Sequence, residues 1–409
     1  MPSSYASLSR AQLAVLVPEL LLIGHLIDRT GMAYAISEFG PEAMTQIAIE
    51  EWAGASPIYA RRMQQALEFE GDDVVTIFKA LQLDIGAPPQ FLDFRFELTD
   101  RLHGEFYLDH CGALLDVEPM GESFVRAMCH DIEDGTFDAT AMATNPRARI
   151  RPVHRPPRTP TDRHPHCRWS VDIEAEPGSP PLPPTPALET LGRTRAATLV
   201  LDPIDTTDEG LSHYRGDLLA DLDFGGFSHS ALVRIADEVV LQMHLLALSF
   251  REAVAARADG ADQRHRVLQG QLIGHAGLAA QRLVAALGLG SEPADAARLM
   301  ELHPMFNPAA YVTVHRDGST ISVEPSAAHD DGAWPAWCGP DRPEALQAIV
   351  RAVDPHLDVD VRPSAQGWSA TVVRNDQPAP LAPAVALANL SLGARFEFEQ
   401  RRSLPLTVI

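Results

Sequence analysis

The most restrictive feature of this sequence is an internal repeat, whose second copy follows the first by about 220 residues. Glu19 and His25 match Glu238 and His244 at one constant offset. Further pairs follow in the same order: Ser9 with Ser228, Leu26 with Leu245, Arg62 with Arg282, Cys111 with Cys338, Arg151 with Arg362, and Trp169 with Trp368. Single identities are common in a chain rich in Ala and Leu, but their shared order predicts two tandem units of one fold.

The charge balance limits the partners of such a protein. The chain of 409 residues has 33 Lys and Arg against 55 Asp and Glu, a net charge of −22. This charge repels phosphate backbones and anionic lipid surfaces, so we expect no nucleic acid and no membrane as a partner. The four cysteines are irregularly spaced, which favours reduced thiols over a disulfide framework.

The sequence also gives no indication of export. The longest apolar stretch, 13–26, is interrupted by Pro18, Glu19 and His25 and is too short to span a bilayer. The N-terminus lacks the basic segment and apolar run that are typical of a secretory signal. We therefore expect a cytoplasmic, bacterial-type enzyme or binding protein.

Hydrophobic periodicity predicts the same order of elements in both units. The first unit has helical spacing over 8–86, then strands at 92–98 and 105–111, a helix at 122–132, and strands at 147–154 and 167–173. The second has helices within 228–302, a hairpin at 311–323, a helix at 343–353, and strands at 358–362 and 368–373. The predicted class is α+β, with two tandem repeats, each a helical bundle followed by a ββαββ antiparallel sheet layer.

These elements divide the chain into four segments. We expect a first unit at 1–175, a Pro-rich and acidic linker at 176–224, a second unit at 225–375, and a C-terminal extension at 376–409. The Pro-rich part, 176–186, should be extended and stiff. The extension should add a helix and a strand at 395–399.

Candidate reactive side chains gather in the first unit, where three of the four cysteines lie among several histidines. Strand alternation points Cys167 inward, helical spacing places Cys129 on an inward stripe, and Cys111 ends a strand. Thiolate and imidazole ligands suit Zn²⁺ or iron. Cys111, Cys129 and Cys167 are therefore candidate metal ligands, with His166, His110 or His130 completing the shell.

Two other interpretations of these thiols remain open. Cys129, His130 and Cys167 are candidate catalytic residues, with a thiol as the nucleophile. Alternatively, the thiols pack as small apolar side chains, as buried free cysteines commonly do. The second unit carries Val350 or Arg351 opposite Cys129 and Gln366 opposite Cys167. Any reactive thiol site should therefore lie in the first unit.

Arginines are concentrated in the same segment of this acidic protein. Arg149, Arg155 and Arg168, together with Trp169, are candidate substrate-binding residues, because guanidinium groups bind carboxylate or phosphate in a bidentate manner. They predict a small anionic molecule as partner. The alternative is that these arginines pair with acidic side chains elsewhere in the protein.

Glu19 and His25 recur in both units and are a further candidate set. They are six residues apart, roughly 240° of helical turn, so they do not share one narrow face. Each could meet an acid on another helix, such as Glu50 or Glu51, and serve as a base or a ligand. The alternative is a pair of satisfied polar positions inside the bundle. The chain has no GxSxG, P-loop or GxGxxG motif.

One family resemblance follows from these residues. The strand that ends in Asp109-His110-Cys111, the helix with Cys129-His130-Asp131, and Cys167-Arg168-Trp169 resemble the L-2-amino-thiazoline-4-carboxylic acid hydrolase-like family and the related 4-vinyl-reductase-type small-molecule-binding domains. The resemblance covers residues 10–175 and, more thinly, 225–375. It implies a small-molecule domain, in some members a ring-opening hydrolase, with Cys111, Cys129 and Cys167 at family-like positions. The chain departs from that pattern in its tandem form, its His-rich insertion and its thiol-poor second unit.

These observations lead to two expectations from different classes. The first is a hydrolase that acts on a small anionic or amino-acid-derived compound through a Cys/His site in the first unit, with Zn²⁺ or iron as cofactor if that site binds a metal. The alternative is a non-catalytic tandem small-molecule-binding protein. A third hypothesis is an interaction scaffold that works as a homo-oligomer.

Overall fold

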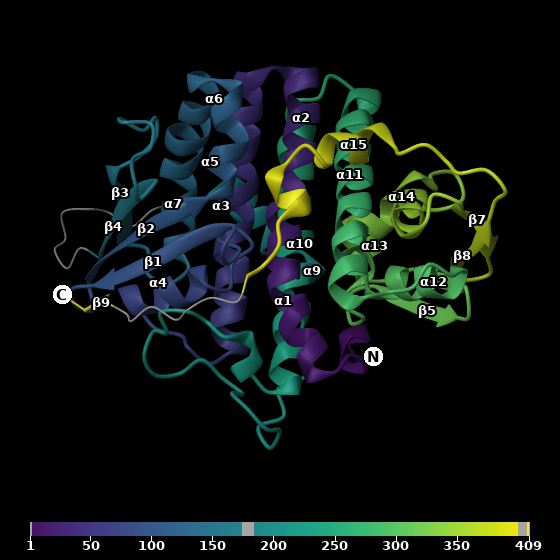
Figure 1. The fold of residues 1–409 in the computed structure, drawn as a ribbon, viewed down its shortest axis with the longest axis horizontal. Helices are drawn as coiled ribbons and strands as arrows, with labels where there is room; N and C mark the ends of the chain where they lie inside the picture. The colour runs from purple at the N-terminus through teal and green to yellow at the C-terminus, as the bar shows by residue number, and fades with distance from the viewer. Residues whose placement is uncertain (1, 174–183, 400–406, 409) are drawn as a thin grey trace.

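Long helices occupy the centre of the molecule, and a mainly antiparallel sheet lies on each side of them (Figure 1). The computed structural model describes residues 2–173, 184–399 and 407–408. The first sheet lies with the N-terminal half of the chain and the second with the C-terminal half. This arrangement confirms the predicted α+β class.

The helices of the two units follow the same plan. The first unit has α1 (Arg10–His25), α2 (Ile27–Phe39), α3 (Pro41–Ala66) and α4 (Val74–Leu81). The second has α10 (His229–Ala255), α11 (Ala261–Leu287) and α12 (Pro293–Leu302). Ser9 and its repeat partner Ser228 cap α1 and α10, because each side chain accepts a hydrogen bond from the backbone N–H three residues on. The main difference is a break at Leu26, which divides the first helical stretch into α1 and α2. The equivalent stretch of the second unit is the single helix α10.

The two sheets have the same strand order. The first contains β1 (Leu92–Leu98), β2 (His103–Cys111), β3 (Ala148–His154) and β4 (Cys167–Ile173). The second contains β5 (Thr313–Asp317), β6 (Thr320–Glu324), β7 (Leu357–Ser364) and β8 (Gly367–Arg374). The orders are β1-β2-β4-β3 and β5-β6-β8-β7, with all of these pairs antiparallel. In addition, β9 (Thr407–Val408) pairs with β1 in parallel.

The crossover between the strand pairs is longer in the first unit. It contains α5 (Gly112–Val117), α6 (Glu122–Arg126), a π-helical turn (Ala127–Ile132) and α7 (Glu133–Met142). The second unit has the short α13 (Ala327–Asp331) and then α14 (Glu344–Val353). Since α7 leads into β3 as α14 leads into β7, these two helices are equivalent. Cys129 lies before α7, whereas Val350 and Arg351 lie within the equivalent helix α14. The predicted match of Cys129 with Val350 or Arg351 is therefore wrong.

Reciprocal ion pairs join the two units. Arg62 binds Glu238 with a shortest N–O distance of 2.9 Å, and its repeat partner Arg282 binds Glu19 at 2.6 Å. Each bridge joins an arginine of one unit to a glutamate of the other. A contact that occurs twice with the partners exchanged is typical of a two-fold interface. The tandem repeat predicted from the sequence is thus a plausible description of the architecture.

The four segments expected from the sequence pack against one another. Helix α3 of the first unit lies along α10 of the second, and α2 of the first unit lies along α11 of the second. The segment before the second unit contains α8 (Pro186–Leu191) and α9 (Arg195–Thr198), and Lys79 donates hydrogen bonds to the carbonyls of Tyr214 and Gly216. Most of the predicted stiff linker, 176–186, lies outside the described residues. One hydrophobic core includes side chains of both units.

The C-terminal segment returns to the first unit. The predicted helix is present as α15 (Pro383–Ala388), which packs on α11 and α2. From there the chain crosses the central helices toward the first sheet (Figure 1). The strand predicted at 395–399 is wrong, and Arg282 there binds the carbonyl of Phe396, a backbone acceptor that a strand would use in a sheet. We call residues 389–399 the C-terminal strap.

One stretch of the described chain is long and apolar enough to cross a membrane by length and composition alone. It spans Arg10–Phe39, and 56% of its most apolar window is buried inside the protein. In the structure, this stretch forms α1 and α2, which pack on α10 and α11. The core helices of soluble proteins pass the same test, so this stretch is weak evidence for a membrane span.

Candidate small-molecule site

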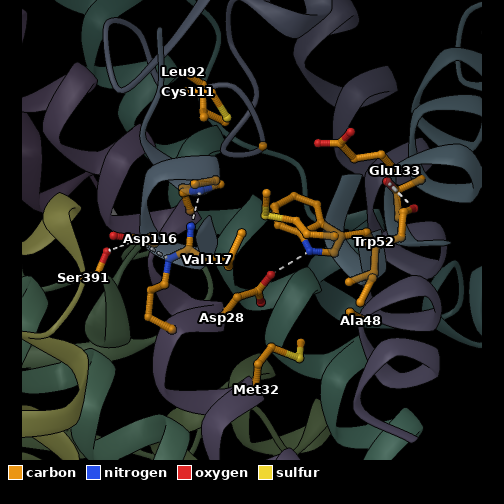
Figure 2. Close-up of a pocket in the computed structure, with 18 of the residues that line it drawn as sticks. Asp28, Met32, Ala48, Trp52, Leu92, Cys111, Asp116, Val117, Glu133 and Ser391 are labelled. Carbon is orange, nitrogen blue, oxygen red and sulfur yellow. Dashed lines mark hydrogen bonds and ion pairs between the residues drawn. The ribbon is translucent and has the colours of Figure 1, made fainter. Parts of the chain in front are cut away.

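A cavity of about 370 Å³ lies between the first sheet and the helices that cover it. Helices α2 and α3 contribute one wall of the cavity and α5 to α7 another, and β1 and β2 contribute Leu92 and Cys111. Figure 2 shows the labelled residues of these elements around the cavity. Much of the lining is apolar and includes Met32, Ala48, Phe94, Phe124, Met128 and Phe137. The volume and this lining are typical of pockets for small organic ligands.

A π-helical turn shapes the second wall. Residues Ala127–Ile132 lie between α6 and α7, and the inserted turn directly precedes Glu133. Such single turns are rare inside helices and often occur at functional sites. Here, the turn contributes Met128 and Ile132 to the cavity lining, and Glu133 follows them into it.

Asp28 and the Trp52 indole form the polar part of the first wall, and Glu51 lies buried next to Asp28. The Trp52 Nε1–H group donates a hydrogen bond of 2.8 Å to Asp28 Oδ2, as Figure 2 shows. Glu51 is fully buried next to Asp28, and the two carboxyl groups are hydrogen-bonded to each other. Burial raises the pKa of both acids, and the proximity of Asp28 raises that of Glu51 further. This pair therefore holds a proton more readily than exposed carboxyl groups do.

Glu133 lies on the other side of Trp52 in Figure 2. Burial raises its pKa to about 8, although the guanidinium of Arg155 opposes this effect. Its Oε2 atom is buried and has no hydrogen-bond partner within the described chain. A carboxyl group that titrates near neutral pH in a cavity can donate or accept a proton there.

The third polar group connects the cavity to the C-terminal strap. Arg29 donates a hydrogen bond of 3.0 Å to His25 and forms an ion pair with Asp116 at 3.2 Å. Asp116 in turn accepts hydrogen bonds from the Ser391 hydroxyl and the Leu392 N–H group. Burial and the neighbouring Arg29 hold the pKa of His25 well below its usual range. His25 is therefore a neutral acceptor. Arg29 is held between His25 and Asp116, and its buried Nε atom has no hydrogen-bond partner among the described residues.

The equivalent place in the second unit is almost filled. The offsets that match His25 with His244 and Arg62 with Arg282 place uncharged residues opposite Asp28, Glu51 and Trp52. Asp28 falls against Ala247, Glu51 against Gln271, and Trp52 against Leu272. These three residues line a space of only about 20 Å³, together with Trp334 and Trp337. Trp334 stacks on His275 with 4.9 Å between ring centroids. The fold therefore does not require either the cavity or its acids.

The structure brings the three predicted thiols near one another, but only Cys111 lines the cavity. Cys111, Cys129 and Cys167 all belong to the core beneath the first sheet. Burial raises the pKa of Cys111 to about 12 and raises those of the other two thiols as well, with Glu133 adding to the effect. Cys111 also accepts a hydrogen bond from the Leu114 N–H group, so it caps α5. These neutral thiols are poor nucleophiles.

The donors for a metal ion are not assembled in this geometry. Among the residues that the structure describes, no group of three or more His, Cys, Asp or Glu side chains is arranged to hold a metal ion. His166 lies beside His110 and His164, and burial together with Arg158 lowers its pKa to about 4. Zn²⁺ or iron at these residues therefore stays a prediction from the sequence.

The other predicted site residues lie outside the cavity lining. His130 Nε2 is 2.7 Å from the carbonyl of Pro156. Arg155 pairs with Asp134, and Arg168 pairs with Glu97 and Glu105. Arg149 binds the carbonyls of Pro146 and Ala148, and Trp169 is fully buried against Phe106 and Phe137. The arginines thus follow the alternative interpretation, in which they engage groups of the protein itself.

The state of the thiols has a direct test. We expect 5,5′-dithiobis(2-nitrobenzoate) to react with Cys111, Cys129 and Cys167 in the folded protein at pH 8 at least about 100-fold more slowly than with the unfolded chain. The reason is that burial both hinders access and suppresses the thiolate. The absorbance at 412 nm with and without guanidinium chloride measures the two rates. A thiol that reacts rapidly in the folded protein would support the nucleophile interpretation instead.

The sequence interpretation overlooked the groups that matter most in this geometry. Asp28, Trp52 and Glu133 are not among the residues that the sequence pattern predicts for a site, and it suggests Glu51 only as a partner for His25. A usable signal was present, because the repeat offsets place uncharged residues opposite Asp28 and Glu51. Glu133 had no comparable signal, since its burial depends on the π-helical turn.

Comparisons with protein-family models, with curated proteins and with solved structures found no match for this chain.

Proposed function

We propose that this protein binds a small, predominantly apolar molecule in the cavity of the first unit, and that the second unit has a structural role. The observation that carries the proposal is the contrast between about 370 Å³ in the first unit and about 20 Å³ at the equivalent place in the second. A cavity that is lined by apolar groups and holds orphan polar atoms is typical of ligand sites. The four buried free cysteines favour a reducing compartment, so we place this function in the cytoplasm.

The polarity-sensitive dye Prodan, which is neutral, is a suitable probe for the cavity. We expect its emission to shift to the blue in the presence of the protein, because the dye leaves water for an apolar site. The Ala48→Trp variant should bind Prodan at least 10-fold more weakly, since Ala48 lines the cavity and the indole would fill it. Fluorescence titration measures both affinities.

The matched control places the same substitution on the surface. Ala11 is exposed on α1, so Ala11→Trp should leave Prodan binding unchanged. Circular dichroism of both variants checks that they fold. Equal binding by Ala48→Trp and the unchanged protein would place the dye elsewhere and contradict the proposal.

A second candidate function is acid–base catalysis on the bound molecule. It is favoured by Glu133, whose pKa of about 8 suits proton transfer near neutral pH. A hydrolase of this kind would use a carboxyl group in place of the buried thiols. Mass spectrometry of compounds that bind would reveal conversion, and Glu133→Gln should abolish that conversion while the uncharged Prodan still binds.

A further inference from the structure

The acids of the cavity define which ligand it would take. Asp28 and Glu133 line the cavity, and the Oε2 atom of Glu133 is buried with no hydrogen-bond partner among the described residues. Asp28 accepts the Trp52 N–H group and is hydrogen-bonded to the buried Glu51 beside it. An unmet buried acceptor costs about 1–3 kcal/mol, and more when it is charged. Most buried polar groups in folded proteins have partners, so an unmet acid at a cavity wall indicates an interaction that a ligand would supply.

The neighbouring cations do not supply this interaction. Arg29 lies at the cavity edge, but it is held by His25 and Asp116. Arg155 is the other cation near Glu133, and it pairs with Asp134 on the outer side of α7. The acids that line the cavity therefore outnumber the available positive charges. An anionic ligand would meet these acids, whereas a cation would be attracted to them.

The walls around the acids suit an apolar body that carries one positive group. The Trp52 indole lines the cavity and is held in place by its hydrogen bond to Asp28 (Figure 2). Aromatic faces attract ammonium groups when water is excluded. Met32, Phe94 and Phe124 line the remainder and offer only apolar contacts.

We propose that the cavity binds an amphiphilic amine, whose ammonium group donates a hydrogen bond to Asp28 within the field of Glu133 and whose apolar body packs on the methionine and phenylalanine walls. This inference rests on the proposed function and narrows it to one class of ligand. It replaces the anion that the arginine-rich segment suggested. The second unit supports it, because Ala247 and Gln271 stand where Asp28 and Glu51 would be.

Three compounds with one apolar body separate the possibilities. They are 4-phenylbutylamine, 4-phenylbutan-1-ol and 4-phenylbutyrate, and isothermal titration calorimetry at pH 7 measures their affinities for the full chain. We expect the amine to bind at least 10-fold more tightly than the alcohol, with the carboxylate weakest. Binding of the amine should also release protons, because the ammonium group favours the ionised form of Glu133, which is largely neutral at this pH. Titrations in phosphate and in Tris buffer detect that release.

Variants then locate the amine. Asp28→Asn retains an acceptor for Trp52 and should weaken amine binding at least 10-fold, while the alcohol changes by less than about 3-fold. Glu133→Gln should also weaken amine binding and should abolish the proton release. The control is Glu122→Gln, because the Glu122 side chain is 65% exposed and pairs only with Arg126. It should change nothing.

The outcomes distinguish the two proposals. If the alcohol binds as tightly as the amine, the amine preference is overturned while the cavity keeps its function. If 4-phenylbutyrate binds most tightly, the amine preference is overturned in favour of the anionic ligand that the arginine-rich segment predicts. If none of the three compounds binds, both proposals fail. Alcohol binding also shows that a variant has folded with its cavity intact, so a loss confined to the amine is not explained by unfolding.

Discussion

Replacement of Arg282 by methionine should lower the free energy of unfolding by about 3–5 kcal/mol. The Arg282 and Glu19 side chains are only 5% and 12% exposed, and the shortest distance between their charged groups is 2.6 Å. Burial raises the pKa of Glu19 even with the guanidinium beside it. Loss of Arg282 would therefore leave a buried carboxyl group without compensation, and would also free the carbonyls of Gly393 and Phe396. Denaturation by urea, followed by circular dichroism, measures the change.

A surface ion pair on the same helix provides the control. Arg266 pairs with Glu38 through two hydrogen bonds of 2.9 Å, but the arginine side chain is 56% exposed. Exposed pairs contribute about 1 kcal/mol or less, so Arg266→Met should have a small effect. The double variant Glu19→Leu with Arg282→Met should recover part of the lost stability, because no buried charge remains. A loss from Arg282→Met that is no larger than that from Arg266→Met would contradict the assigned role of this bridge.

The same bridge shows what can be predicted from this sequence. Glu19 and Arg62 each have a repeat partner, which is sufficient to identify them as scaffold positions. Which arginine binds which glutamate does not follow from the repeat, because a pairing within each unit and a pairing between the units match the sequence equally well. Only the packing of α3 on α10 and of α1 on α11 determines that the bridges cross between the units.

The elements were predicted more successfully than the site, and for a physical reason. Strand alternation and turn residues are local, so β1 to β8 lie close to their expected positions. The cavity depends on the depth of Asp28 and Glu51 within a bundle that is shared by two units, and on the π-helical turn before Glu133. Clustering along the sequence instead drew attention to thiols that pack beneath the sheet and to arginines that engage groups of the protein itself.

Replacement of Glu133 by glutamine should raise the free energy of unfolding at pH 8.5 by about 3–5 kcal/mol, and should change it by less than about 1 kcal/mol at pH 4. The pKa of Glu133 is raised from 4.5 to about 8 in the folded protein. Below pH 4.5 the carboxyl group is neutral in both the folded and the unfolded chain, so it has no effect on the balance. As the pH rises toward 8, the unfolded chain gains the free energy of ionisation and the folded protein does not. Glutamine removes that penalty and retains the shape of the side chain.

The start of the equivalent helix supplies the matched control. Glu344 begins α14 as Glu133 begins α7, but Glu344 is exposed to solvent. Glu344→Gln should therefore leave the stability within about 0.5 kcal/mol of the unchanged protein at both pH values. Asp84 and Asp237 also have raised pKa values, of about 6 and about 7, but they are present in every protein compared and cancel in the difference. Urea denaturation between pH 4 and pH 8.5 gives the three curves. Parallel curves for Glu133→Gln and the unchanged protein would show that Glu133 ionises freely, and the cavity would then lack the neutral acid on which both proton release and acid–base catalysis depend.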